Sequence, residues 1–290
     1  MKRTLSLLMA VLMLTAVVLT GCSSGGTTSG AASSSDASSA SSEAESESSA
    51  AEENDLLAQI KEKGTITVAM EGTWAPWTYH DADDNLVGYD VEVAQNIAEK
   101  LGVEVNFVEG EWDGLLAGLD DGRYDIMVNG VGVTEERAEK YNFSTPYAYN
   151  RTAVIVRDDY KEINSMEDLE GKTTANTISS TYETQAEAHG ATVTGVDDLN
   201  QTIELLLSGR IDATLNAEVV FADYVKEHPE AKIRIATFSD EVEKVAIPIR
   251  KGDDTATLLA AVNDALKEMS EDGTLTALSE KYFGTDISKE

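Results

Sequence analysis

The chain has 290 residues, a formal net charge of −31, three histidines and a single cysteine. So large an excess of acidic side chains argues against binding to nucleic acid and against adsorption to anionic lipid, because both need a basic surface. The scattered histidines and the lone cysteine leave little material for a zinc site. The sequence predicts no cofactor and no bound metal.

Residues 1–21 have the layout of a secretory signal peptide. Lys2 and Arg3 give a positive start, an apolar run follows from Leu5 to Leu19, and small residues close the segment. The apolar run is shorter than the roughly 20 residues that a spanning helix needs, which favours export over a transmembrane anchor.

Cys22 is interpreted as the site of a lipid anchor. The segment LTGC at residues 19–22 resembles the lipobox of bacterial lipoproteins, in which cleavage before the cysteine is coupled to its lipidation. The alternative is a free reactive thiol, which exported proteins tend to avoid. Residues 23–54 are almost entirely Ser, Ala, Gly, Thr and Glu, so residues 22–54 are expected to form a lipidated, disordered tether.

A short motif occurs twice in the remaining chain. GRYDIMVN at residues 122–129 returns as GRIDATLN at residues 209–216, and each copy follows an apolar segment of helical type and enters an apolar strand. Further strand-like runs precede the copies, at residues 64–70 and 103–108 in the first half and at 171–176 and 191–196 in the second. This order predicts two α/β lobes built on parallel sheets.

Asn129 and Asn216 stand at the carboxyl ends of the two repeated strands. Ligands bind beyond these ends in open α/β sheets, so two lobes placed face to face would form a cleft lined from both sides. The alternative is a duplication without a shared site.

Residues 88–102, GYDVEVAQNIAEKLG, predict a core helix. Their apolar residues recur at helical spacing, Gly102 ends the pattern, and Asp90 is the expected N-cap.

The same segment resembles the signature of family 3 of the bacterial extracellular solute-binding proteins, the polar amino acid receptors of ABC importers. The resemblance runs from Gly64 to Gly284 and includes TEER at 134–137, FSTPY at 143–147, GK at 171–172, GRIDA at 209–213 and KYFG at 281–284. It implies a two-lobed periplasmic-binding-protein-like (type II) α/β fold, in which each lobe is a sheet flanked by helices and two crossover strands form the hinge. Lobe 1 is then expected at residues 55–149 and 247–290, and lobe 2 at residues 150–246.

Arg137 is the first candidate for ligand binding. Thr134 can cap a helix in which Arg137 is the third residue, where the helix dipole disfavours a cation and a capping box would place Glu or Gln. A cation beside unpaired backbone N–H groups makes an anion site, and arginine adds a two-pronged grip on a carboxylate. A weak surface pair with Glu135 or Glu139 is the alternative. By the resemblance, Arg137 holds the α-carboxylate of the ligand.

Other site positions are implied by the resemblance. Gly130 and Gly132 match places where backbone groups or hydroxyls contact the ligand, although Gly132 has no hydroxyl to offer. The stretch 179–181 matches one whose hydroxyls and N–H groups close over the same carboxylate, with an ordinary polar turn as the alternative. Trp74 and Trp112 match aromatic walls around the ligand side chain, and core packing is the alternative for both, as it is expected for Trp77. The predicted ligand-binding set is Glu71, Trp74, Trp112, Asn129, Gly130, Gly132, Thr134, Arg137, Ser179, Ser180, Thr181 and Asn216.

Two positions need a separate interpretation. The acidic run at 81–85 has the spacing of a calcium loop, but Leu86 stands where such a loop requires glycine, so a solvated β-turn is expected. Ala217 stands where most family members have an Asp that pairs with the α-ammonium of the ligand. Either Glu71, Asn216 or Glu218 takes that role, or the ligand has no free α-amine.

The sequence therefore predicts a monomeric, extracytoplasmic substrate-binding protein of an amino acid ABC importer, lipid-anchored to the cell membrane. It would capture a polar amino acid or cystine between two lobes by hinge closure and present it to the permease, with no nucleic-acid partner. One alternative is a dehydratase-type enzyme on the same fold that acts on a prephenate-like acid, which would need an acid or base in the cleft. Another is a ligand-sensing receptor subunit.

Overall fold

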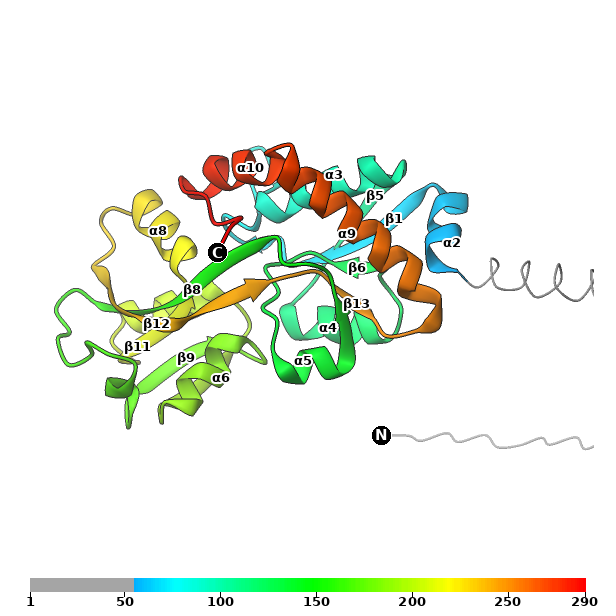
Figure 1. Ribbon diagram of the computed structural model, residues 1–290. Helices are drawn as coiled ribbons and strands as arrows, with labels where there is room; N and C mark the ends of the chain where they lie inside the picture. The colour runs from blue at the N-terminus through cyan, green and yellow to red at the C-terminus, as the bar shows by residue number, and fades with distance from the viewer. Residues whose placement is uncertain (1–54) are drawn as a thin grey trace, which may run out of the picture. The chain divides into compact units, whose positions relative to one another are not determined.

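The computed structural model describes residues 55–290, and the predicted signal peptide, lipid anchor at Cys22 and tether lie outside that range. The described elements form two α/β lobes, which Figure 1 shows side by side with two long strands running between them. Within residues 55–290, no helix is both long enough and apolar enough to cross a membrane, and no three metal-ligating side chains gather as a metal ion would require.

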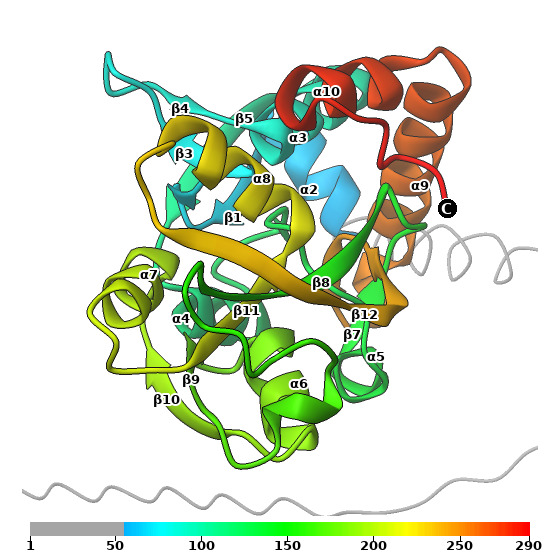
Figure 2. The same ribbon diagram turned by 90° about the vertical axis from the view of Figure 1, so that its left-hand side faces the viewer.

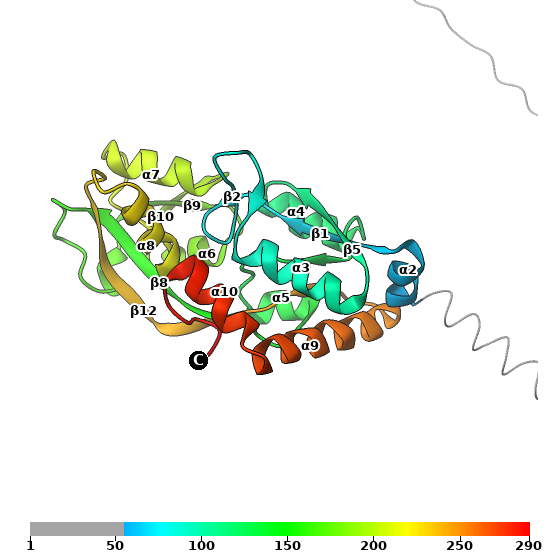
Figure 3. The same ribbon diagram turned by 90° about the horizontal axis from the view of Figure 1, so that it is seen from above.

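The first lobe is built on a parallel sheet in the order β5-β1-β6. Helices α3, α9 and α10 pack on one another on one side of this lobe (Figure 3). The elements of the sheet and its helices are β1 (Thr65–Met70), β5 (Glu104–Glu109), β6 (Ile126–Met127), α2 (Leu56–Lys63), α3 (Tyr89–Leu101), α4 (Trp112–Asp120), α5 (Glu135–Lys140), α9 (Ala256–Glu271) and α10 (Thr274–Phe283). Two small antiparallel sheets belong to the same lobe. One consists of β2 (Thr73–Trp74), β3 (Thr78–His80) and β4 (Leu86–Val87), and the other of β7 (Tyr141–Phe143) and β13 (Pro248–Arg250). The 3₁₀ turn η2 (Asp253–Thr255) precedes α9.

The second lobe has a five-stranded sheet in the order β10-β9-β11-β8-β12. Its elements are β8 (Ala148–Arg157), η1 (Glu167–Leu169), β9 (Thr173–Thr177), α6 (Thr181–Ala188), β10 (Thr192–Val196), α7 (Leu199–Leu207), β11 (Ala213–Ala217), α8 (Glu218–Glu227) and β12 (Ile233–Val245). Strands β10, β9 and β11 are parallel, whereas β8 and β12 run antiparallel to their neighbours. The three strands that the sequence predicts for this lobe are therefore parallel, as expected, and the two strands that lead to and from the first lobe add an antiparallel edge to the sheet.

Strands β8 and β12 make the connection between the lobes (Figure 2). They pair along most of their length, from Ile233 opposite Arg157 to Val245 opposite Ala148. The register of this pairing shifts at two places, between residues 235 and 237 and between 238 and 242. Such irregularities bend a strand and increase its twist, which redirects the pair as it passes from one lobe to the other.

The repeated motif builds the same junction in both lobes. Its two copies lead into β6 and β11, and each of these strands lies beside the first parallel strand of its lobe, β1 or β9. Gly122 and Gly209 open the copies with φ of 67° and 72°, a left-handed conformation that favours glycine. The three parallel strands therefore follow the same order in the two lobes.

The aspartate of the motif fixes the register at this junction. Asp125 Oδ2 accepts a hydrogen bond from the N–H of Thr67 at 2.7 Å, and the N–H of Asp125 donates to the carbonyl of Thr67 at 3.0 Å. Asp212 makes the same two hydrogen bonds with Thr173, both at 2.9 Å. In each lobe, the aspartate of the motif thus joins the segment that leads into the third parallel strand to the first parallel strand.

Helix α3 begins differently from the prediction. Gly88 is its N-cap, so the assignment of Asp90 to that position is wrong. Gly88 has φ 137°, and a Cβ there would lie 2.2 Å from the carbonyl oxygen of Trp77, which excludes any other residue. Asp90 is instead fully buried, and its carboxylate accepts hydrogen bonds from the N–H of Gly130 and the hydroxyl of Tyr147, at 2.5 and 2.7 Å. Burial raises the pKa of Asp90 to about 7, against the effect of these two hydrogen bonds.

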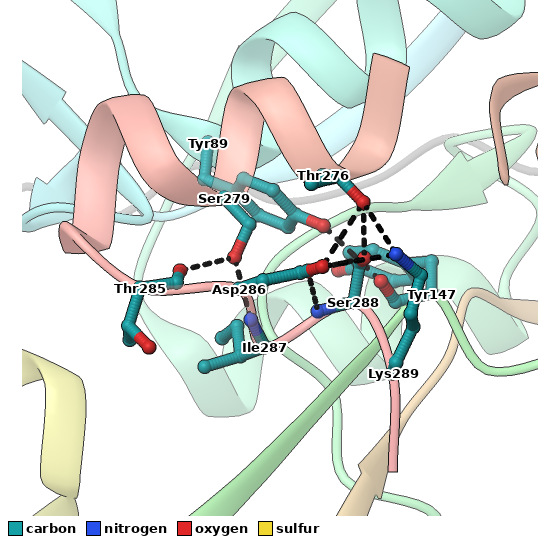
Figure 4. A network of polar contacts seen from close by, with 9 residues as sticks. All are labelled: Tyr89, Tyr147, Thr276, Ser279, Thr285, Asp286, Ile287, Ser288 and Lys289. Atoms are coloured by element: carbon teal, nitrogen blue, oxygen red, sulfur yellow. Dashed lines mark hydrogen bonds and ion pairs between the residues drawn. The ribbon is translucent and has the colours of Figure 1, made fainter. Parts of the chain in front are cut away.

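The C-terminal tail folds back on α10 through a network of polar contacts (Figure 4). Ser279 Oγ donates to the carbonyl of Thr285 and accepts from the N–H of Ile287, both at 2.8 Å. The N–H of Tyr149, on β8, donates to the carbonyl of Ile287 at 2.7 Å. The end of the chain therefore holds one connecting strand against the first lobe.

Asp90→Ala is expected to lower the free energy of unfolding by about 2–6 kcal/mol, because two buried donors lose their acceptor and each costs about 1–3 kcal/mol. Urea denaturation measures the loss. Asp264→Ala, at an exposed position on α9, is the control and should change stability by less than about 0.5 kcal/mol. Equal stabilities for the two variants would contradict the role given to Asp90.

Candidate functional site

A cavity of about 30 Å³ lies where elements of the two lobes meet. Most of the predicted ligand-binding residues line it, namely Glu71, Trp74, Trp112, Gly130, Gly132, Arg137, Ser180, Thr181 and Asn216. Five other residues also line it and were not predicted from the sequence: Thr73, Thr177, Tyr182, Asp198 and Leu199. A water molecule needs about 10–15 Å³ by such a measure, so the cavity has room for only a few waters and the lobes lie closed upon it.

Arg137 is buried in the wall of this cavity, 9% exposed. Thr134 caps α5 by accepting the N–H of Arg137, as predicted, which makes Arg137 the third residue of the helix. The guanidinium donates through Nη1 to the carbonyl of Gly132 at 3.0 Å and lies 5.1 Å from the ring centre of Trp112. Burial lowers the pKa of Arg137, and the charge of Glu243 opposes this shift. The alternative of a surface ion pair does not fit its burial.

Two side chains of lobe 1 donate hydrogen bonds to one backbone carbonyl of lobe 2, that of Ser179. It accepts a hydrogen bond from Arg137 Nη2 at 3.1 Å and another from Trp112 Nε1 at 3.2 Å. Ser179 has φ 62°, and the next residue, Ser180, caps α6 by accepting the N–H of Glu183. The cap fixes the turn that presents the carbonyl to the other lobe.

Two tryptophans form apolar walls of the cavity. Trp74 is 9% exposed and stacks on Trp77 with ring centres 5.5 Å apart, while its Nε1 donates to Asn216 Oδ1 in the other lobe at 3.3 Å. Gly130 has φ 55°, and a Cβ there would lie 2.5 Å from the indole of Trp74. Glycine at this position therefore lets the indole lie directly on the backbone. Trp77 is 1% exposed, which confirms its expected place in the core.

Glu71 is the acidic group of the first lobe at this cavity. Asn129 holds it twice, because Asn129 Nδ2 donates to Glu71 Oε2 at 2.7 Å and Asn129 Oδ1 accepts the N–H of Glu71 at 2.8 Å. Burial raises the pKa of Glu71 to about 7; the hydrogen bond from Asn129 opposes the rise and the charge of Asp198 adds to it. Glu71 is thus a carboxyl group poised to lose its proton near neutral pH.

Three predicted residues lie beside the cavity rather than in its lining: Asn129, Thr134 and Ser179. Each positions a lining group, since Asn129 orients Glu71, Thr134 caps the helix of Arg137, and Ser179 offers its carbonyl to Arg137. Thr134 and Ser179 also line a second, larger cavity of about 740 Å³, and Arg137 lines both cavities. Their direct contact with a ligand stays a prediction.

A carboxylate from the connecting strand approaches Arg137. Glu243, on β12, lies where a side chain on residue 132 would be, because a Cβ on Gly132 would fall 1.9 Å from Glu243 Oε1. Burial raises the pKa of Glu243, while a hydrogen bond with Thr181 and the charge of Arg137 lower it. The absence of a side chain at Gly132 therefore leaves space for the carboxyl group of Glu243.

Strand β11 supplies no charge to the cavity at residue 217. Ala217 is fully buried, and its N–H donates to Asn216 Oδ1 at 2.8 Å. Glu218 is paired with Arg151 at 2.9 Å and is not among the lining residues. Of the three replacements that the sequence suggests, only Glu71 brings a carboxylate to the cavity.

Two α/β lobes joined by two strands, with a cavity between them, define the type II fold of periplasmic binding proteins. The chain belongs to the bacterial extracellular solute-binding proteins, family 3, whose family model matches residues 66–285. This confirms the resemblance seen in the sequence. The L-cystine-binding protein TcyA of Bacillus subtilis (strain 168) is 42% identical over 240 residues, which cover 82% of this chain and 88% of the relative.

Solved structures show the same fold. An ancestral arginine-binding protein bound to arginine superposes with a TM-score of 0.71 at 36% identity, over 76% of this chain and 99% of the other. The L-cystine solute receptor of Neisseria gonorrhoeae, in its unliganded open conformation, gives a TM-score of 0.56 at 40% identity, over 81% of this chain and 99% of the other.

Proposed function

We propose that the protein is the lipid-anchored receptor of an amino acid ABC importer. It binds an amino acid between lobe 1, residues 55–149 and 247–290, and lobe 2, residues 150–246. The lobes close over the ligand by bending at β8 and β12, and the closed form is presented to the permease. The receptor works as an extracytoplasmic monomer attached to the membrane through Cys22.

The observation that carries this proposal is the charge pattern of the cavity. Arg137 is the one cationic residue among the described residues that line it, and its planar guanidinium suits a carboxylate. Glu71 lines the same cavity with a carboxyl group that suits an ammonium. An amino acid carries both complementary charges, and burying them costs little only when each is paired.

The relatives narrow the ligand class. TcyA is described as binding L-cystine, and the ancestral protein was solved with arginine. Both compounds are α-amino acids with a further cationic group, and the walls of Trp74 and Trp112 suit an aliphatic, sulfur-containing or cationic side chain. A polar amino acid or cystine is therefore the proposed ligand.

Hinge closure accounts for the way the solved structures superpose. The unliganded open cystine receptor is the more identical in sequence, yet it superposes less well than the arginine-bound protein. A difference in lobe arrangement gives this result without any difference in fold. The hydrogen bonds from Arg137 and Trp112 to Ser179 are contacts that an open arrangement would break.

An enzymatic role would need a group that transfers a proton in the cleft, and Glu71 is the candidate by its pKa near 7. The relatives favour a binding role. Incubation of the protein with a prephenate-like acid, followed by analysis for product, tests the enzymatic alternative. A sensing role would show as binding without transport.

Arg137→Ala is expected to weaken binding of L-cystine and L-arginine by about 2–5 kcal/mol, because a charge-assisted pair in a desolvated cleft is lost. The wild-type protein should become more compact in solution scattering when it binds, and the variant should not. Arg123→Ala, at an exposed position of the same lobe, is the control. Wild-type affinity in Arg137→Ala would place the carboxylate site elsewhere, and absence of binding by the wild type would contradict the proposed function.

Glu71→Gln is expected to weaken L-cystine binding about 10-fold or more at pH 8, since about 1.4 kcal/mol corresponds to each factor of ten. Wild-type affinity should fall as the pH drops below about 7, because protonation of Glu71 removes the charge that meets the ammonium, and the variant should lose this dependence. Calorimetry on L-cystine and on 3,3′-dithiodipropionate, its analogue without amines, measures the contribution of the ammonium. The control is Glu104→Gln, exposed on β5. Equal affinities for the two compounds would remove Glu71 from this role.

Cys22→Ser is expected to move the protein out of the membrane fraction without changing its affinity for L-cystine, because the lipid anchor lies far along the chain from residues 55–290. Fractionation followed by immunoblotting measures the shift. Ser23→Ala, one residue along, is the control. Full membrane retention of Cys22→Ser would contradict lipidation at this residue.

A further inference from the structure

The cavity has a second acidic side chain in its lining, which was not predicted from the sequence. Asp198 lines it, on lobe 2, together with Glu71 from lobe 1. Asp198 is the N-cap of α7, and its Oδ1 accepts the N–H of Gln201 at 3.0 Å. The helix behind it is anchored in the core by Ile203 and Leu206, so the position of the carboxylate is fixed by packing.

The location of Asp198 follows from the sheet. Strands β10, β9 and β11 are parallel, so their carboxyl ends share one edge. Ala217 ends β11 at this edge, and Asp198 follows β10, two strands away. A carboxylate at residue 198 can therefore reach the same cleft that a carboxylate at residue 217 would reach. The two positions lie at the same edge of the sheet, at the ends of β10 and β11.

Two carboxylates face one small cavity from opposite lobes. Like charges in a partly desolvated space repel, and the charge of Asp198 accordingly adds to the rise in the pKa of Glu71. The repulsion acts most strongly when the lobes are closed, because it falls with distance. A cation placed between the two carboxylates would turn this repulsion into attraction from both sides.

We propose that Asp198 supplies the second-lobe carboxylate that residue 217 lacks, so that a cationic group of the ligand is held between Glu71 and Asp198. Asp198 is then a specificity-determining residue. It favours ligands that carry an ammonium or guanidinium, and it makes closure depend on that group, since a ligand without a cation leaves the two acids opposed. This inference rests on the proposed amino acid binding.

The test uses a matched pair of neighbouring aspartates. Asp198→Asn removes one charge but keeps the cap, because Asn is as good an N-cap as Asp. Asp197→Asn removes the same charge one residue earlier, at an exposed position that does not line the cavity. Calorimetry with L-cystine, L-arginine and 3,3′-dithiodipropionate gives the affinities of both variants.

Asp198→Asn should bind the tighter of the two amino acids at least about tenfold more weakly than the wild type, and Asp197→Asn should stay within about twofold. The double variant Asp198→Asn with Ala217→Asp should recover most of the loss, because it moves the carboxylate to the position usual in the family. Asp198→Asn should not weaken 3,3′-dithiodipropionate.

The outcomes separate the two proposals. Equal losses in Asp198→Asn and Asp197→Asn would overturn the role of Asp198 and leave amino acid binding in place. Equal losses for compounds with and without amines would also overturn it, since the residue would then act through the fold. Failure of the wild type to bind either amino acid would instead contradict the proposed function.

Discussion

The burial of one cation constrains much of the cleft. Arg137 lies in the interface of the lobes with its guanidinium directed at backbone carbonyls of both, Gly132 in lobe 1 and Ser179 in lobe 2. These two carbonyls are neutral, and the charge that acts most strongly on Arg137 from within the protein is that of Glu243 on β12. Arg137 thus links the two lobes by its hydrogen bonds, and the carboxylate of the proposed ligand would meet it where both lobes are within reach.

Much of the fold could be predicted from local sequence, because the repeat encodes it locally. Gly122 and Gly209 turn the chain, and Asp125 and Asp212 pin the next strand to its neighbour within each lobe. The direction of β8 and β12 could not be predicted in this way, since it depends on how two lobes are joined. The misplaced N-cap had a similar cause: the partners of Asp90 are contributed by distant parts of the chain.

In the site, too, residues set by local sequence could be predicted and residues brought in by distant parts of the chain could not. Arg137 was recognisable because a cation at the third position of a capped helix contradicts local preference and so indicates a role outside the helix. Asp198 was not recognisable, because Asp at an N-cap is what local preference favours, and only the sheet edge brings it to the cavity. Local sequence also offered no sign that Glu243 occupies the space next to Gly132 where a side chain would otherwise lie, because Glu243 is on a strand more than a hundred residues away.

The three tryptophans of the chain differ in what their indoles touch. Trp74 donates to Asn216 and Trp112 to the carbonyl of Ser179, each across the seam, whereas Trp77 is enclosed in the core of the first lobe. Under the proposed hinge motion, separation of the lobes would break the first two contacts and expose both rings to water, while Trp77 would keep its surroundings. Intrinsic fluorescence would then report on lobe separation, with two tryptophans that respond to it and a third that serves as an internal reference.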